Sequence, residues 1–214
     1  ESTHGRELWK SNGTAAGTVL VKDINLPGGG GSIDSSPAEL TNVAGTLFFR
    51  ALETNGIELW RSDGTAGGTK LVKNIAPSNG WSTPDHLTNV AGTLFFSADD
   101  QSTYGRELWK SDGTAAGTKI VKDISSGAGG ASTDSSPAEL TNVAGTLFFR
   151  AGEATNGIEL WSSNGTAAGT KLVKNIAPSN GWSTPDYLTN AAGTLFFTAD
   201  DQSTYGRELW KAAP

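Results

Sequence analysis

Apolar residues in this chain occur in short runs that occupy both faces of an extended segment. Residues 47–49 are Leu-Phe-Phe, and the apolar pairs at 59–60 and 71–72 follow them. Because neighbouring side chains of a strand point to opposite faces, these runs predict strands that are covered on both sides. No segment has apolar residues at a helical spacing over about 10 residues, so we expect almost no helix. Runs of about 18 apolar residues are also absent, which argues against a membrane-spanning helix.

The stretch from residue 40 to residue 73 contains four predicted strands joined by short links. Ala44 and Gly45 separate the first two strands, and glycine supplies the positive φ that a two-residue hairpin turn needs. A longer link rich in Gly, Ser and Pro then leads to the next unit. This order predicts a four-stranded antiparallel meander. Its strands are expected at 40–43, 46–50, 57–61 and 69–73.

The whole chain repeats this unit about every 50 residues. The string Thr-Leu-Phe-Phe starts at Thr46, Thr93, Thr146 and Thr194. The string Glu-Leu-Trp places its tryptophan at Trp9, Trp60, Trp109, Trp161 and Trp210, all of which we expect to pack in the core. Alternate units are the most similar, because residues 70–85 recur unchanged at 171–186. The chain is therefore two copies of a double unit, which indicates recent duplication or deliberate construction.

The predicted fold is all-β, a β-propeller of four blades with four antiparallel strands each. A ring of blades covers both faces of every sheet, whereas a β-sandwich does not explain the fourfold repeat. Residues 1–214 form one repeat domain, and its last blade is closed by pairing between N- and C-terminal strands, which removes exposed edges. The blades are expected at about 39–75, 86–125 and 138–176, and at 187–211 completed by 6–24.

One strand is left over in this closed ring. The segments 2–10 and 203–211 differ only by His4 against Tyr205, and both match the third strand of the last blade. Either one terminus is displaced, or the spare strand pairs with another chain. A homodimer through the surplus strand and an open array are therefore alternatives to the closed monomer.

Twelve-residue segments centred on the Asp-Gly-Thr turns resemble the ELWxxDGTxxGT repeat family. The segment ELWRSDGTAGGT is the copy at 58–69, and the others lie at 7–18, 107–118 and 159–170. The resemblance implies a propeller-like repeat of large bacterial proteins that are exported or surface-attached, hence an extracellular or cell-surface location. It implies no established activity. The chain departs from the motif at Asn12 and Asn164, where the family has Asp, and the last copy ends as ELWKAAP.

Composition narrows the classes of partner. The chain has 16 basic and 22 acidic residues, a net charge of −6, which argues against nucleic acid and membrane insertion. It contains no cysteine, which excludes disulfides, thiol catalysis and thiolate metal sites. Without an initiator Met or a signal peptide, we expect a mature, processed or excised fragment.

The links between units carry the candidate ligand site. Asn-Gly-Trp-Ser-Thr-Pro-Asp occurs at 79–85 and again at 180–186, outside the strands. In a meander these links emerge on the same side as the loops between second and third strands. An exposed aromatic ring beside Asp is typical of a carbohydrate platform, and the alternative is that each Trp packs beneath its own loop. The predicted ligand-binding residues are Trp81, Asp85, His86, Tyr104, Trp182, Asp186, Tyr187 and Tyr205.

The sequence supports a metal site less strongly than it supports the ligand site in the links. The loops between second and third strands carry the adjacent carboxylates Asp99, Asp100, Asp200 and Asp201, which are candidate Ca²⁺ ligands. No spaced D-x-D-x-D-G pattern is present, and solvated surface charge is the favoured alternative. Asp63, Asp112, Asn12 and Asn164 precede glycine, and we interpret them as turn residues. No other cofactor is expected.

Catalysis is not expected. His4 and His86 occupy positions where other copies carry Tyr, and no nucleophile, metal or phosphate-binding motif is present. We therefore interpret the chain as a non-catalytic propeller module that binds or displays a glycan or protein ligand on its loop face. A purely structural or designed scaffold is the alternative. A glycosidase-like enzyme is a weaker alternative, because the sequence does not show whether the fold brings two carboxylates to the separation that glycoside hydrolysis requires.

Overall fold

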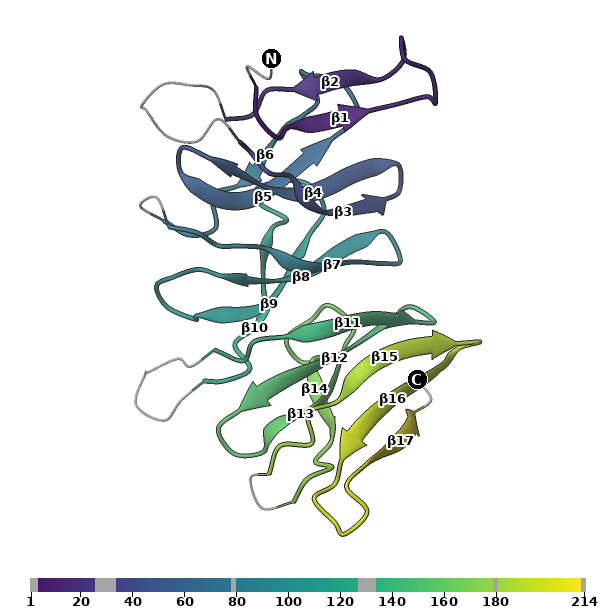
Figure 1. Ribbon diagram of the computed structural model, residues 1–214. Helices are drawn as coiled ribbons and strands as arrows, with labels where there is room; N and C mark the ends of the chain where they lie inside the picture. The colour runs from purple at the N-terminus through teal and green to yellow at the C-terminus, as the bar shows by residue number, and fades with distance from the viewer. Residues whose placement is uncertain (1–3, 26–33, 78–79, 127–133, 179–180, 213–214) are drawn as a thin grey trace.

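The chain is described by a computed structural model that covers residues 4–25, 34–77, 80–126, 134–178 and 181–212. These residues form seventeen strands in five antiparallel sheets, and none of them is helical (Figure 1). No helix that could cross a membrane occurs in the described ranges. The expected all-β repeat architecture is confirmed.

Three complete sheets stand between two incomplete ones. The first sheet contains β1 (Leu8–Lys10) and β2 (Val19–Lys22). The complete sheets are β3 (Ala38–Val43), β4 (Thr46–Glu53), β5 (Gly56–Ser62) and β6 (Lys70–Lys73); β7 (Asp85–Val90), β8 (Thr93–Asp99), β9 (Arg106–Ser111) and β10 (Lys119–Lys122); and β11 (Ala138–Val143), β12 (Thr146–Glu153), β13 (Gly157–Ser163) and β14 (Lys171–Lys174). The last sheet contains β15 (Asp186–Ala191), β16 (Thr194–Asp200) and β17 (Arg207–Ala212).

Each complete sheet is the predicted meander, with its strands paired in sequence order. Val43 pairs with Thr46 across the first turn, where Ala44 has φ 49° and Gly45 has φ 87°. Positive φ at both central residues is the turn geometry that matches the twist of a two-residue hairpin.

The sheets are stacked face to face, with their first strands side by side: β3 contacts β7, β7 contacts β11, and β11 contacts β15 (Figure 1). Polar side chains join these first strands. Thr41 Oγ1 donates a 3.1 Å hydrogen bond to Leu87 O, and Asn89 Nδ2 donates one of 3.1 Å to Asn42 O. The same bonds recur at the next two steps of the stack.

The hydrophobic core lies between the sheets. Phe48 and Leu59 of one sheet pack in a single buried cluster with Phe96 and Trp109 of the next. Equivalent clusters fill the three remaining interfaces between neighbouring sheets. Burial on both faces is therefore confirmed. The expectation of a buried tryptophan is wrong at Trp9, which is 55% exposed because no sheet precedes β1.

The expected closure between N- and C-terminal strands is not present in this structure. β1 and β2 form a sheet of their own. β17 pairs with β16, in the sheet that residues 6–24 were expected to complete. The two incomplete sheets lie at opposite ends of the stack (Figure 1). A physical reason is loop entropy: β17 reaches β16 through a short loop, whereas β1 must close a loop of nearly the whole chain. The stack of sheets is thus propeller-like without a closed ring.

Candidate functional site

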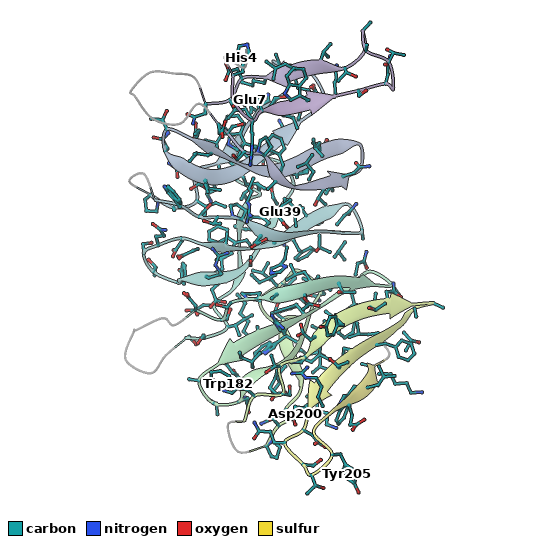
Figure 2. The ribbon with its side chains drawn as sticks, viewed as in Figure 1. His4, Glu7, Glu39, Trp182, Asp200 and Tyr205 are labelled. Carbon is teal, nitrogen blue, oxygen red and sulfur yellow. The ribbon has the colours of Figure 1, made fainter. Side chains whose placement is uncertain are left out.

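Trp81 and Trp182 are exposed to solvent, with 54% and 62% of their surface accessible. Each lies in the link that leaves a complete sheet, after β6 and after β14 respectively. Neither ring is buried beneath its own loop, which was the alternative to a ligand platform. Figure 2 shows Trp182 on the same side of the stack as the loop before β17 that carries Tyr205.

Each exposed tryptophan lies between the turns of two neighbouring sheets. Gly56, in the β4–β5 turn, has φ 112°, and a Cβ added there would lie 2.8 Å from Trp81 Cδ1. On the other side, Gln101 Nε2 donates a 2.9 Å hydrogen bond to Trp81 O. Gly157 repeats the first contact, because an added Cβ would lie 2.5 Å from Trp182 Cδ1. Glycine at this turn therefore leaves room for the ring.

A buried serine follows each tryptophan and anchors the link. Ser82 Oγ donates a 2.7 Å hydrogen bond to Glu58 Oε2, and Ile75 N donates one of 2.8 Å to the same oxygen. Glu58 is fully buried on β5. Its burial raises the pKa of the carboxyl, against the opposing effect of these hydrogen bonds. The link is thus fastened immediately after the tryptophan, while the ring stays outside.

Sequence reasoning missed this role of the Glu-Leu-Trp string. Glu107 and Glu159 are also fully buried and accept hydrogen bonds from Ser135 Oγ and Ser183 Oγ, each of 2.6 Å. Desolvation raises the pKa of Glu107 to about 7. A glutamate repeated on an otherwise apolar strand was the signal for a buried polar anchor.

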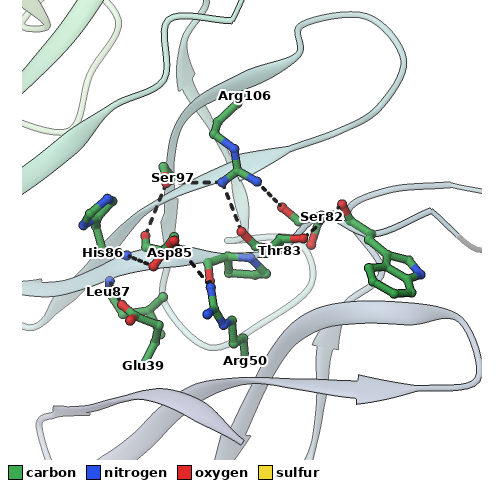
Figure 3. Close-up of polar contacts among 11 residues, drawn as sticks. Glu39, Arg50, Ser82, Thr83, Asp85, His86, Leu87, Ser97 and Arg106 are labelled. Carbon is green, nitrogen blue, oxygen red and sulfur yellow. Dashed lines mark hydrogen bonds and ion pairs between the residues drawn. The ribbon is translucent and has the colours of Figure 1, made fainter. Parts of the chain in front are cut away.

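Asp85 and Asp186 begin the first strands of their sheets and face arginines of the preceding sheet. Arg50 Nη1 lies 3.4 Å from Asp85 Oδ2, and Arg150 Nη1 lies 2.7 Å from Asp186 Oδ1. Figure 3 shows the first of these pairs, with Arg106 reaching the carbonyl of Thr83 beside it. These carboxylates therefore bridge sheets.

His86 and Tyr187 follow these aspartates at a β-bulge, each with φ 56°. Tyr187 is 74% exposed, whereas His86 is half-buried. Alternate sheets carry Glu39 and Glu139 at this position, and both carboxylates accept a 3.3 Å hydrogen bond from the first strand of the next sheet. Figure 3 shows the bond from Leu87 N to Glu39.

The candidate Ca²⁺ ligands accept hydrogen bonds from backbone amides of the loops in which they lie. Asp100 accepts hydrogen bonds from the amides of Ser102, Thr103 and Tyr104, at 3.2, 3.2 and 3.1 Å. Partial burial would raise the pKa of Asp100, but these bonds hold it below its usual range. Asp99, Asp200 and Asp201 each accept one amide bond two residues further on. Within the described ranges, no group of three His, Cys, Asp or Glu side chains could hold a metal ion.

A shallow cavity of about 280 Å³ lies beside Trp182. Its polar lining includes Asp134, Ser136 and Glu153, which sequence reasoning did not select. Asp134 and Ser136 precede β11, and Glu153 ends β12, so only the packing of the link onto the β12–β13 turn brings them to the ring. In the sequence, the Ser-Ser-Pro string that occurs at 35–37 and again at 135–137 was the available signal for this part of the cavity lining.

The eight predicted binding residues do not form one cluster. A larger cavity of about 600 Å³, between Arg6, Arg50 and Thr83, is lined by none of them. Tyr104 and Tyr205 lie in the loops before β9 and β17, and Tyr205 is 82% exposed. Trp182 lines the smaller of these two cavities.

Comparison with known proteins gives little further information. No protein-family model matches the chain, so its resemblance to the ELWxxDGTxxGT repeats stays a prediction. No curated protein matches either. Among solved structures, the chain is similar to an endo-1,4-beta-xylanase from Bacteroides thetaiotaomicron, with a TM-score of 0.39 and 12% identity over 91% of this chain and 75% of that one. A likeness of this size supports no conclusion about fold or activity.

Proposed function

We propose that the chain is a non-catalytic binding module in which Trp182 and its cavity receive a saccharide ring. Trp81, in the equivalent link, presents a second exposed ring, although it lines none of the cavities described above. The observation that carries the proposal is the shared exposure of these two rings, 54% and 62%, in links that are otherwise anchored to the sheets. An indole face is a flat apolar surface, which suits the C–H face of a sugar.

The polar groups beside Trp182 suit the hydroxyl groups of such a ligand. Asp134 and Glu153 supply acceptors, and Ser136 both donates and accepts hydrogen bonds. A pocket that combines an apolar wall with a few polar groups is the usual form of a small-molecule site. Because the polar groups include two carboxylates, a neutral saccharide is preferred over an anionic one.

Catalysis is not part of the proposal. Glu107 has a raised pKa, which is common at active sites, but its carboxylate is fully buried and bonded to Ile124 N and Ser135 Oγ. That environment is structural and leaves no room for a substrate.

Calorimetric titration with a panel of neutral oligosaccharides tests the proposal. The parent is expected to bind two ligands per chain, the single variants Trp81→Ala and Trp182→Ala one each, and the double variant none. Tyr205→Ala is the matched control, because this ring is exposed but lies outside the cavity, and it should bind like the parent. Thermal unfolding should be unchanged in all four variants.

Heat of binding that survives in a folded double variant would contradict the proposal. Absence of binding to every saccharide in the parent would favour the scaffold alternative or a protein ligand, since exposed aromatic residues also mark protein contacts.

A further inference from the structure

The N-terminal end of the stack exposes apolar side chains that are buried in the internal repeats. Leu40 on β3 is 56% exposed, whereas its counterparts Leu87 and Leu188 are each 8% exposed and Leu140 is half-buried. Trp9 on β1 is 55% exposed, whereas Trp60 is 5% exposed. By analogy with Leu140, Leu40 faces the place where the first two strands beside β1 are missing. By analogy with Trp60 and Trp161, Trp9 faces the place of a sheet before β1.

The C-terminal end has a complementary set of exposed residues. Leu209 on β17 is 71% exposed, whereas Leu160 is 1% exposed. Val173 on β14 is 40% exposed, whereas Val121 is 6% exposed. Within the described residues the last sheet has no fourth strand, because β17 is the third strand and pairs with β16 alone.

The internal interfaces indicate which residues would cover these positions. Val121 packs against Trp161 and Leu172 of the following sheet, so the equivalent cover for Val173 is Trp9 with Leu20. Similarly, Leu140 packs against Val90 and Phe95 of the sheet before it. The equivalent cover for Leu40 is Ala191 with Phe196. The exposed residues of one end thus match those of the other.

We propose that these ends join between two copies of the chain. The β1–β2 hairpin of one copy pairs with β15 and β16 of another, in the place of β17, and completes a four-stranded sheet. The stack then continues from copy to copy, head to tail. Such a heterologous contact either closes into a ring or extends as an array, and a reciprocal pair of chains would contain eight complete sheets.

β1 is held more firmly than the strand it replaces, although residues 5–10 and 206–211 have the same sequence. Glu7 is buried and accepts hydrogen bonds from Ile24 N at 2.9 Å and Ser35 Oγ at 2.6 Å. Its counterpart on β17, Glu208, is exposed. β17 lacks both the fourth strand and the following link that supply those donors. Exchange therefore replaces a weakly anchored third strand by an anchored one.

The exchanged sheet also supplies a missing lysine contact. Lys73 Nζ lies 5.7 Å from the centroid of Trp109 and donates a 2.7 Å hydrogen bond to Thr118 O. Lys174 already lies 4.9 Å from the centroid of Trp210, but among the described residues its Nζ has no carbonyl partner equivalent to Thr118 O. In the exchanged sheet, Trp9 takes the place of that ring and Thr18 provides the carbonyl. A lysine over an aromatic face is an attractive contact.

The partner is a second copy because the two ends of one chain lie at opposite ends of its stack (Figure 1). A second copy docks without altering the interfaces between the three complete sheets, and it replaces the pairing of β16 with β17 by an equivalent pairing with β1. Closure within one chain would require each step of the stack to bend further.

Cysteine cross-linking tests which chain supplies the hairpin, since the chain contains no cysteine. Asp99 pairs with Arg106 across β8 and β9, so Asp200 of one copy should face Arg6 of the other. Mixing the separate variants Arg6→Cys and Asp200→Cys under oxidising conditions should give a disulfide-linked species with one chain of each. Light scattering of the parent should give a mass of at least two chains. A single-chain mass, or a disulfide that forms only within a chain carrying both cysteines, would overturn the proposal.

A pair of substitutions separates strand exchange from simple stacking of the ends. Leu40→Lys changes a side chain that is exposed in the single chain and buried in the assembly, so it should weaken association at least tenfold. Leu209→Lys changes the strand that is released and should leave association unchanged. Thermal unfolding of the dilute variants reports whether both stay folded. Association that resists Leu40→Lys, or that is lost with Leu209→Lys in a folded chain, would overturn the exchange.

Discussion

Ser82 Oγ donates a 2.7 Å hydrogen bond to Glu58 Oε2, and both residues are fully buried. Glu58 belongs to β5, whereas Ser82 directly follows the exposed Trp81 in the link to the next sheet. The bond therefore ties the link to the sheet that it leaves. The pair Ser183 and Glu159 repeats it two sheets further along the chain.

Removal of this buried acceptor should destabilise the fold. Glu58→Ala leaves the amides of Ile75 and Ser82 without their acceptor, and each unsatisfied buried donor costs about 1–3 kcal/mol. We expect the free energy of unfolding in urea to fall by at least about 2 kcal/mol. Glu208→Ala is the matched control, because this glutamate of the same motif is exposed, and its effect should stay within about 0.5 kcal/mol. Equal losses in the two variants would contradict the anchoring role.

Stability should depend on pH through Glu107. Burial raises its pKa from 4.5 to about 7 in the folded chain, so the fold favours the protonated carboxyl. The resulting stabilisation is present in full below pH 4.5 and is lost as the pH rises through about 7. We expect the free energy of unfolding to fall by up to about 3 kcal/mol over that interval. Urea unfolding at pH 4.5, 6 and 7.5 measures it.

Glu107→Gln is the control for this pH dependence, because an amide does not ionise. The variant should show a smaller decrease in stability between pH 4.5 and 7.5, with Glu58, whose pKa is also raised by burial, still contributing. An unchanged pH profile would show that Glu107 is not responsible. Asp63 and Asp112 do not contribute to the change in the free energy of unfolding between pH 4.5 and 7.5. Hydroxyl and amide hydrogen bonds from Thr65 and Thr114 lower their pKa values below 3.8, so their contribution is lost only in stronger acid.

Gly157 should be required for the position of Trp182. An added Cβ would lie 2.5 Å from Trp182 Cδ1, and φ of +70° is itself unfavourable for alanine. Gly145→Ala is the matched control, because this glycine has φ +87° but no heavy atom within 4 Å of an added Cβ. Gly145→Ala should cost about 1–2 kcal/mol from backbone strain alone.

Gly157→Ala should cost a further 1–3 kcal/mol, roughly, from steric overlap with the ring and with Gly181 O, which would lie closer still to the added Cβ. It should also reduce saccharide binding at Trp182, whereas Gly145→Ala should not. Chemical unfolding and calorimetric titration of the two variants provide the comparison, and equal stabilities would show that the ring moves aside without cost.

Asp100 should act as a loop residue and not as a metal ligand. Asp100→Ala removes the acceptor for three amides and should lower the free energy of unfolding by about 1–2 kcal/mol. Asp201→Ala removes the amide and hydroxyl hydrogen bonds of Ser203 at an exposed loop and should cost less than about 0.5 kcal/mol. Millimolar Ca²⁺ should not change the thermal midpoint of the parent, and a rise that Asp100→Ala abolishes would restore the metal-site prediction.

The amino-acid sequence by itself determined the strands, the hairpin turns and the stacking of sheets. Residues 47–49 require cover on both faces of a strand, and Ala44 with Gly45 suits a two-residue turn. These features follow from side-chain alternation and local backbone geometry, so they do not depend on distant parts of the chain. The sequence also located Trp182 in a link between sheets.

Only the tertiary structure decided how the ends of the chain pair and which rings are exposed. Residues 5–10 and 206–211 are identical, so no local property can choose between them as the partner of β16. The short connection to β16 selects β17 within one chain. In the same way, Asp134 and Glu153 reach Trp182 only because separate segments pack together. Identical sequences acquire different roles when their surroundings differ, and those surroundings are long-range contacts.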